Sequence, residues 1–171
     1  RAIFKINNIE AFISSNPGVE TILTAADVPG ENSFGIYPDL KDQPVFADGL
    51  VRYRGEAVLA IVGTKGAVDA LKFADIPIDW KPQNPISGIA AALMEASNAI
   101  HENTPDNVLT RGRLRKGTIE GAFENGAVAV GDLQTAFVEH AYIEPEAGFA
   151  KRVGNRIEIT ACTQAPYMDL D

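Results

Sequence analysis

The chain has 171 residues, of which 46% are hydrophobic and 22% are charged, and its formal net charge is −8. This length and composition suit one globular domain, or one domain plus part of another, with about two-thirds of the unfolded surface buried. The acidic balance argues against a surface for nucleic acid or anionic membranes. A single cysteine excludes an internal disulfide and any metal cluster held by thiolates of this chain alone.

Five short segments have the apolar pattern of strands, namely 3–6, 19–23, 49–53, 58–63 and 76–80. Asn8 is a suitable N-cap for a short helix over 9–15, and Thr64 is suitable for a second helix. One apolar stripe marks that second helix, formed by Ala67, Ala70, Leu71 and Ala74. The order strand, helix, strand predicts a βαβ-like unit, in which 58–63 is a buried strand.

The rest of the chain divides into a helix, a connector and a β-rich end. Residues 89–100 predict a helix, and 101–126 are polar and glycine-interrupted, as in a connector that lies across a larger body. The cationic run at 111–116 lacks interleaved aromatics, so we interpret it as a solvated part of that connector. The apolar run 127–143 predicts a strand. Gly154-Asn155 predicts a hairpin turn, so about three antiparallel strands are expected here.

The stretch EHAYIEPEAGFA (139–150) concentrates ionisable side chains. Glu139, His140, Glu144 and Glu146 could form a metal site, an acid–base pair or a polar strand edge. Pro145 disfavours a helix that would bring His140 beside Glu144. On a strand, those two residues lie about 13 Å apart, too far to share one ion. We therefore expect these residues to be polar side chains at the end of a strand. The alternative is a hydrolase in which Glu144 and Glu146, on one face of the strand, act as paired carboxylates.

Two further residues with reactive side chains have simpler interpretations. His101 follows an apolar helix and is expected to cap its C-terminus. Cys162 lies in an alternating strand and is expected to be buried and inert. The sequence holds no phosphate-binding glycine loop, nucleophile elbow or HExxH motif. The residues by themselves therefore assemble no complete active site.

Several stretches, in order along the chain, nevertheless resemble one family. They are TAADVPGENSFG (24–35), DQPVFADGLVRYRGEAVLAIVG (42–63) with its alanine-rich helix, KGTIEGAF (116–123), EHAYIEPEAGFA (139–150) and CTQAP (162–166). Together they resemble the large molybdenum-binding subunit of the xanthine dehydrogenase/aldehyde oxidase family. The matches span nearly the whole chain. They imply an α+β fold, with an α/β hammerhead domain at 1–88, a connector at 89–126 and the first strands of a molybdopterin-binding domain at 127–171.

The resemblance also implies a function. The parent protein is expected to hydroxylate an aldehyde or N-heterocycle carbon with water as oxygen source, using molybdopterin with molybdenum. Electrons would leave through iron–sulfur and flavin subunits or domains. Gln164 is the one residue that matches a position near the metal in some members; as an ordinary strand amide it would instead bond to backbone. The family's glycine-rich loop and its catalytic glutamate belong to a downstream portion, so no residue here is assigned those roles.

Three expectations concern the protein as a whole. The sequence starts without Met and stops just after a strand-like run, so we expect both ends to be cut from a longer protein. As an isolated piece it is expected to be inactive and to bind no cofactor. No apolar run reaches the 18–20 or so residues of a membrane span and no signal peptide opens the chain, which together with the charge predicts a cytoplasmic location. The alternative function is a non-catalytic acidic interaction or scaffold domain.

Overall fold

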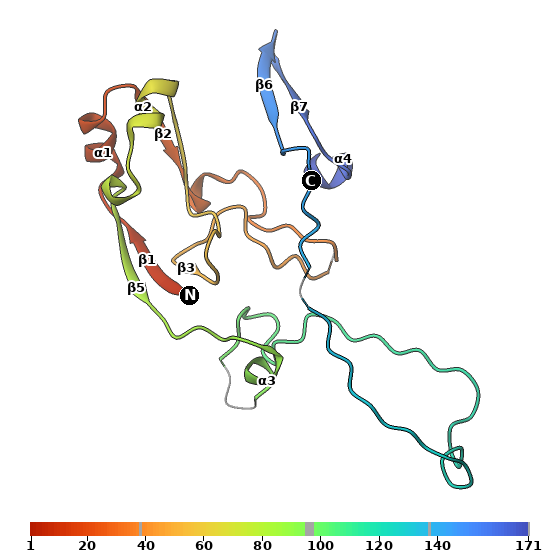
Figure 1. The fold of residues 1–171 in the computed structure, drawn as a ribbon. Coiled ribbons are helices and arrows are strands. Elements are labelled where there is room, and N and C mark those ends of the chain that lie inside the picture. The colour runs from red at the N-terminus through yellow and green to blue at the C-terminus, as the bar shows by residue number, and fades with distance from the viewer. Residues whose placement is uncertain (38, 95–97, 137, 171) are drawn as a thin grey trace. The chain divides into compact units, whose positions relative to one another are not determined.

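The computed structural model describes residues 1–37, 39–94, 98–136 and 138–170. It divides the chain into two compact units, Arg1–Gly112 and Arg113–Asp171. Short helices and small antiparallel sheets occur in both units, so the predicted α+β class is confirmed (Figure 1). Within the described residues, no helix is long and apolar enough to cross a membrane.

Two antiparallel sheets form the first unit. In the larger, β1 (Ala2–Ile6) lies between β3 (Leu50–Val51) and β5 (Ile78–Pro82). In the smaller, β2 (Val19–Leu23) pairs with β4 (Ala60–Gly63). The βαβ-like prediction is therefore wrong, because β4 and β5 belong to different sheets and every pairing is antiparallel. Hydrophobic periodicity identifies strands but does not report which strands exchange hydrogen bonds.

The helices of the first unit begin where the sequence predicts. The Asn8 side chain accepts a hydrogen bond from the backbone N–H of Ala11 at 3.1 Å and so caps α1 (Ile9–Ser15), which is confirmed. Helix α2 (Lys65–Ala70) follows Thr64, whose side chain makes no capping hydrogen bond. The unit also contains two short 3₁₀ helices, η1 (Ala25–Asp27) and η2 (Phe73–Asp75).

A small apolar core packs the larger sheet against the segment that contains Ala47. The most buried residues of this core are Phe4, Ala47 and Val51, and the Phe4 ring packs against Trp80 with ring centroids 5.6 Å apart. The predicted burial of the strand within 58–63 is wrong in part, because Val62 of β4 is 41% exposed. A two-stranded sheet has few neighbours to cover its faces, so an apolar run does not guarantee burial.

The predicted helix over 89–100 is much shorter than expected. Helix α3 spans Ile89–Ala92, and residues 95–97 of the predicted helix lie outside the described part of the chain. The Asn107 side-chain amide donates to the carbonyl oxygens of Ala92 at 3.0 Å and Asn98 at 3.1 Å. The Ala92 carbonyl, at the C-terminal end of α3, thus accepts a hydrogen bond from a side chain.

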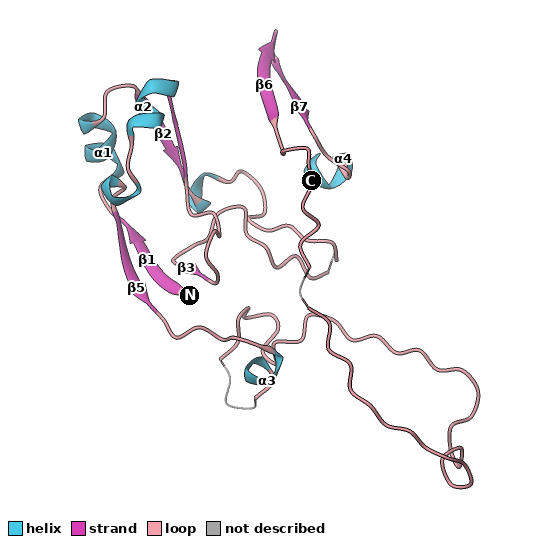
Figure 2. Cartoon of the chain, viewed as in Figure 1, coloured by secondary structure: helices cyan, strands magenta, loops and turns pink. Residues whose placement is uncertain are grey.

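The second unit is built around one hairpin. Strands β6 (Gly148–Val153) and β7 (Arg156–Ala161) pair along their full length, which confirms the predicted hairpin, and α4 (Pro166–Leu170) follows. The third strand, predicted over 127–143, does not form in the described residues of that run, which exclude Phe137 and are drawn as loop in Figure 2. These residues are exposed and pair with no strand, and without a ladder partner a β-favouring sequence stays irregular.

Candidate functional site

An open groove lies at the end of the β6–β7 hairpin that carries Cys162 and Gln164. Two adjoining cavities of about 580 and 630 Å³ make up this hairpin groove. Both cavities are lined by Glu146, Ala161, Cys162, Thr163 and Gln164. The groove therefore collects most of the candidate residues that the sequence singles out near the C-terminal end of the chain.

The hairpin sequence explains why the groove forms at this end. Gly154 adopts a left-handed φ of 64° in the turn, a conformation that glycine takes without steric cost. At the opposite end Gly148 pairs with Ala161, and a Cβ on Gly148 would lie 2.9 Å from the Thr160 carbonyl oxygen. One further pair of contacts, between Ala147 and Cys162, follows this pair, and beyond it the described residues of the hairpin form no strand pairing. The groove opens where the ladder stops.

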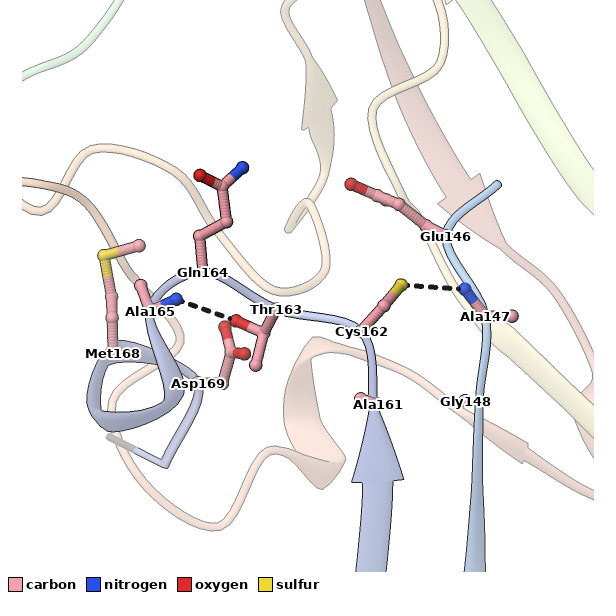
Figure 3. A pocket seen from close by; sticks show the side chains of 10 residues that line it. All are labelled: Glu146, Ala147, Gly148, Ala161, Cys162, Thr163, Gln164, Ala165, Met168 and Asp169. Atoms are coloured by element: carbon pink, nitrogen blue, oxygen red, sulfur yellow. Dashed lines mark hydrogen bonds between the residues drawn. The ribbon is translucent and has the colours of Figure 1, made fainter. Parts of the chain in front are cut away.

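Cys162 extends the hairpin by one further pair of contacts. Its backbone N–H donates to the Ala147 carbonyl at 3.1 Å, and its sulfur accepts from the Ala147 N–H at 3.1 Å (Figure 3). The thiol is exposed, so the predicted burial of Cys162 is wrong, and its inertness stays a prediction. Strand β7 ends one residue earlier, and none of the hairpin residues is buried. Burial depends on a covering layer, which alternation along one strand cannot report.

Gln164 occupies the loop between β7 and α4. Its side chain is exposed, lines both cavities and extends from the loop to the side opposite the Thr163 hydroxyl (Figure 3). Within the described part of the chain, its amide has no hydrogen-bond partner among the side-chain contacts, so it does not behave as an ordinary strand amide bonded to backbone. A free amide can donate through Nε2 and accept through Oε1 to a bound molecule.

The ionisable cluster at 139–146 does not assemble as one site. The His140 ring stacks on Tyr142 with centroids 5.9 Å apart, and the Glu139 carboxylate accepts from the His140 backbone N–H at 3.0 Å. Glu144 and Glu146 both border the second cavity, as the hydrolase hypothesis requires, and that hypothesis stays a prediction. Within the described residues, no group of three or more His, Cys, Asp or Glu is arranged to hold a metal ion.

His101 belongs to a different site, in the first unit. It lines a polar cavity of about 270 Å³ together with Asp42 and Arg52, and its Nε2 lies 4.0 Å from the Asp42 carboxylate. The expected helix cap is wrong, because α3 ends at Ala92. Burial and then the Arg52 charge lower the pKa of His101 below 6.5, while Asp42 and Glu56 act against them. The lowering dominates, so the imidazole beside Asp42 is mainly neutral at pH 7.

Sequence inspection missed the charged pair behind His101. The Glu56 side chain is 3% exposed; it accepts from the Arg52 guanidinium at 3.1 Å and from the Arg52 backbone N–H at 2.5 Å. Arg52 also donates through Nε to the Ile100 carbonyl at 3.2 Å, which ties the chain after α3 to the residue that follows β3. The available signal was an oppositely charged pair at a spacing of four residues, next to an apolar run. Sequence inspection also did not identify Thr163 as a groove residue, because its only signal was its place beside Gln164.

The cationic run at 111–116 serves local contacts. Arg111 donates to Asp106 and Arg115 donates to Glu120, each at 2.7 Å, and all four side chains are exposed. The hydrogen bond from Arg111 lowers the pKa of Asp106 below 3.8. These cations neutralise neighbouring carboxylates in a loop, in agreement with a solvated connector.

Comparison with known proteins gives one consistent result. Residues 100–170 match the family model described as "Molybdopterin cofactor-binding domain". The chain is 30% identical over 154 residues to the nicotinate dehydrogenase large molybdopterin subunit of Eubacterium barkeri, covering 89% of this chain and 35% of that protein. It is also 30% identical over 134 residues to a probable xanthine dehydrogenase subunit of Bacillus subtilis, covering 78% of this chain and 17% of that protein.

A solved structure agrees with these relatives. The aldehyde oxidoreductase from Desulfovibrio gigas superposes on 94% of this chain with a TM-score of 0.75 and 26% identity, and the match covers 18% of that structure. The chain thus spans about a third of the nicotinate dehydrogenase subunit and under a fifth of the other two proteins. The hairpin groove lies inside the region that matches the cofactor-binding model.

Proposed function

Because this chain belongs to the xanthine dehydrogenase/aldehyde oxidase family of molybdenum hydroxylases, we propose that it forms part of a large molybdopterin-binding subunit. In this proposal, residues 1–88 are the α/β hammerhead domain, 89–126 are the connector and 127–171 begin the cofactor domain. The match of residues 100–170 to the cofactor-binding model supports membership of such a subunit, and it begins within the proposed connector. We also propose a cytoplasmic location, on the acidic balance of the chain.

The proposed reaction is oxidative hydroxylation of a carbon in an aldehyde or N-heterocycle, with water as the oxygen source. The names of the relatives support this substrate class, since nicotinate and xanthine are N-heterocycles and the solved structure is an aldehyde oxidoreductase. When bound, the molybdenum cofactor supplies the two-electron oxidation, and the protein supplies binding and orientation. Iron–sulfur and flavin subunits or domains are the proposed electron acceptors.

The groove residues are compatible with such a cofactor. Gln164 presents a free, exposed amide to a cavity of about 580 Å³, and an amide N–H can donate a hydrogen bond to an oxygen of the bound cofactor. The match of residues 100–170 to the cofactor-binding model carries the assignment, and the free Gln164 amide in this groove carries only the proposed contact with the cofactor. Its contribution is to orient and polarise the bound group, and outer contacts of this kind typically change affinity or activity by about 10–100-fold.

The test uses the complete large subunit with its partner subunits, purified after expression with molybdate. We expect molybdenum by elemental analysis and oxidation of nicotinate, xanthine or an aldehyde with an artificial electron acceptor. Gln164→Ala is expected to lower kcat about 10–100-fold. The matched control is Gln134→Ala, which removes an exposed glutamine that does not line the groove and should stay within about twofold of the parent.

One result would contradict this assignment, and another would contradict the expected inactivity of the isolated chain. If the purified subunit carries no molybdenum and oxidises none of the substrates, the chain is an interaction or scaffold domain instead. Molybdenum and substrate oxidation by the isolated 171-residue chain would contradict the proposal that this piece alone is inactive. Equal activity of the Gln164 and Gln134 variants would leave the family assignment intact but remove the role of Gln164.

A further inference from the structure

Gln164 lies in a segment of three residues that is held at both ends. On its N-terminal side, Cys162 is tied to Ala147 by the two hydrogen bonds of 3.1 Å described above. On its C-terminal side, Pro166 begins α4, and the carbonyl of Ala165 accepts from the backbone N–H groups of Met168 and Asp169. The conformation of the chain between these anchors decides where the Gln164 amide points.

One side-chain contact sets that conformation. The Thr163 hydroxyl accepts a hydrogen bond from the Ala165 backbone N–H at 3.0 Å, across Gln164 (Figure 3). Hydroxyl side chains stabilise turns in this way by bonding to the N–H two residues further on. Proline at 166 has no N–H and restricts the backbone of Ala165, so the Ala165 amide is the last donor before the helix and Thr163 satisfies it.

The groove offers little else to hold the loop. Thr163 and Gln164 are both exposed, and no residue of the second unit within its described part is buried. Within the described part of this chain, the loop is therefore held by this hydrogen bond and its two anchors and not by packing. The Thr163 hydroxyl turns to one side of the loop, and the Gln164 amide extends to the other (Figure 3).

We propose that Thr163 is a positioning residue, whose hydroxyl closes the turn that directs the Gln164 amide into the hairpin groove. This inference rests on the proposed function of Gln164. It predicts that the acceptor oxygen of Thr163, and not the shape of its side chain, determines how well Gln164 contacts a bound molecule.

The test compares three variants in the complete large subunit with its partners. Thr163→Val keeps the branched shape but removes the acceptor, Thr163→Ser keeps the acceptor, and Gln164→Ala removes the contact itself. The first readout is hydrogen–deuterium exchange at the Ala165 amide in cofactor-free protein, measured by fragmenting the peptide that contains it. We expect Thr163→Val to raise the exchange rate about fivefold, the factor that corresponds to loss of one hydrogen bond of roughly 1 kcal/mol, and Thr163→Ser to leave it within about twofold.

The second readout is kcat and KM of the cofactor-loaded protein. We expect Thr163→Val to lower kcat about tenfold, less than Gln164→Ala, and Thr163→Ser to recover most of the loss. Unchanged exchange across residues 148–161 shows that the hairpin is still folded in Thr163→Val. If the hairpin of that variant is unfolded, Thr163→Ala replaces it, with the same expected rise in Ala165 exchange and loss of kcat.

The outcomes separate the two proposals. If Gln164→Ala has no effect, the role of Gln164 is wrong and the positioning inference falls with it. If Gln164→Ala lowers kcat while Thr163→Val matches the parent in both exchange and kcat, only the positioning inference is overturned. Faster Ala165 exchange with an unchanged kcat overturns it as well, because the turn would then be structural only.

Discussion

Different interactions hold the two units of this chain together, core packing in the first and local hydrogen bonds in the second. The first unit buries Phe4, Ala47 and Val51 in a core and encloses the Glu56 carboxylate. The second unit has no buried residue within its described part, and Phe149 and Ile159 of its hairpin are 61% and 74% exposed. A two-stranded hairpin by itself is only marginally stable in water. The unit that carries the candidate groove thus has the least packing of its own, and local hydrogen bonds define its geometry.

Removing one phenylalanine from each unit should give the largest difference. Phe4→Ala is expected to lower the free energy of unfolding by about 4 kcal/mol, because it leaves a cavity in the core beside Trp80. Phe149→Ala, on the exposed hairpin, is expected to change it by less than about 0.5 kcal/mol. Urea denaturation of this chain, followed by the fluorescence of Trp80 and by far-ultraviolet circular dichroism, measures both. Equal losses would show that the hairpin has a core of its own.

A charged pair provides the second comparison. Arg52→Met should cost about 3 kcal/mol, because it leaves the buried Glu56 carboxylate without its cation and frees the Ile100 carbonyl. The matched control is Arg111→Met, which breaks an exposed pair with Asp106 and should not move the denaturation midpoint measurably. The double variant Arg52→Met with Glu56→Leu should recover part of the loss. If Arg52→Met behaves like the control, the pair adds nothing to the first unit.

The smallest expected effect is a pH dependence confined to the first unit. Burial and Arg52 lower the pKa of His101, so the unfolded chain binds this proton more readily than the folded one. The stability that His101 contributes is therefore complete above about pH 6.5 and is lost as the pH falls through the lowered value. We expect the denaturation midpoint to fall between about pH 7.5 and 5.5, and His101→Gln to reduce that fall.

Asp42 supplies the control for this prediction. Its carboxylate raises the pKa of His101 and so opposes the lowering, as does Glu56. Asp42→Asn should therefore lower the pKa further and make the loss of stability at low pH larger. A smaller loss in the Asp42 variant would mean that the imidazole is charged and ion-paired at neutral pH, contrary to a neutral His101.

The candidate site was only partly accessible to sequence reasoning. Gln164 was identified through a resemblance, on the motif CTQAP; its side chain lines the groove, and its contact with a cofactor stays a prediction. Thr163 lies in the same motif, but its role depends on a distance of 3.0 Å between its hydroxyl and the Ala165 N–H. The sequence alone does not predict this distance, because the same threonine in a regular strand would not direct its hydroxyl toward the Ala165 N–H.

Local interactions are what the sequence by itself determined. Asn8 caps α1, Gly154-Asn155 turns the hairpin, and Pro145 keeps His140 and Glu144 out of a helix, since each effect acts within a few residues. Strand pairing and burial were decided by the tertiary structure. The pairing of β5 with β1 and the exposure of Cys162 depend on which distant segments supply a ladder partner or a covering layer, and hydrogen bonds and packing between distant segments leave no fixed spacing in the chain.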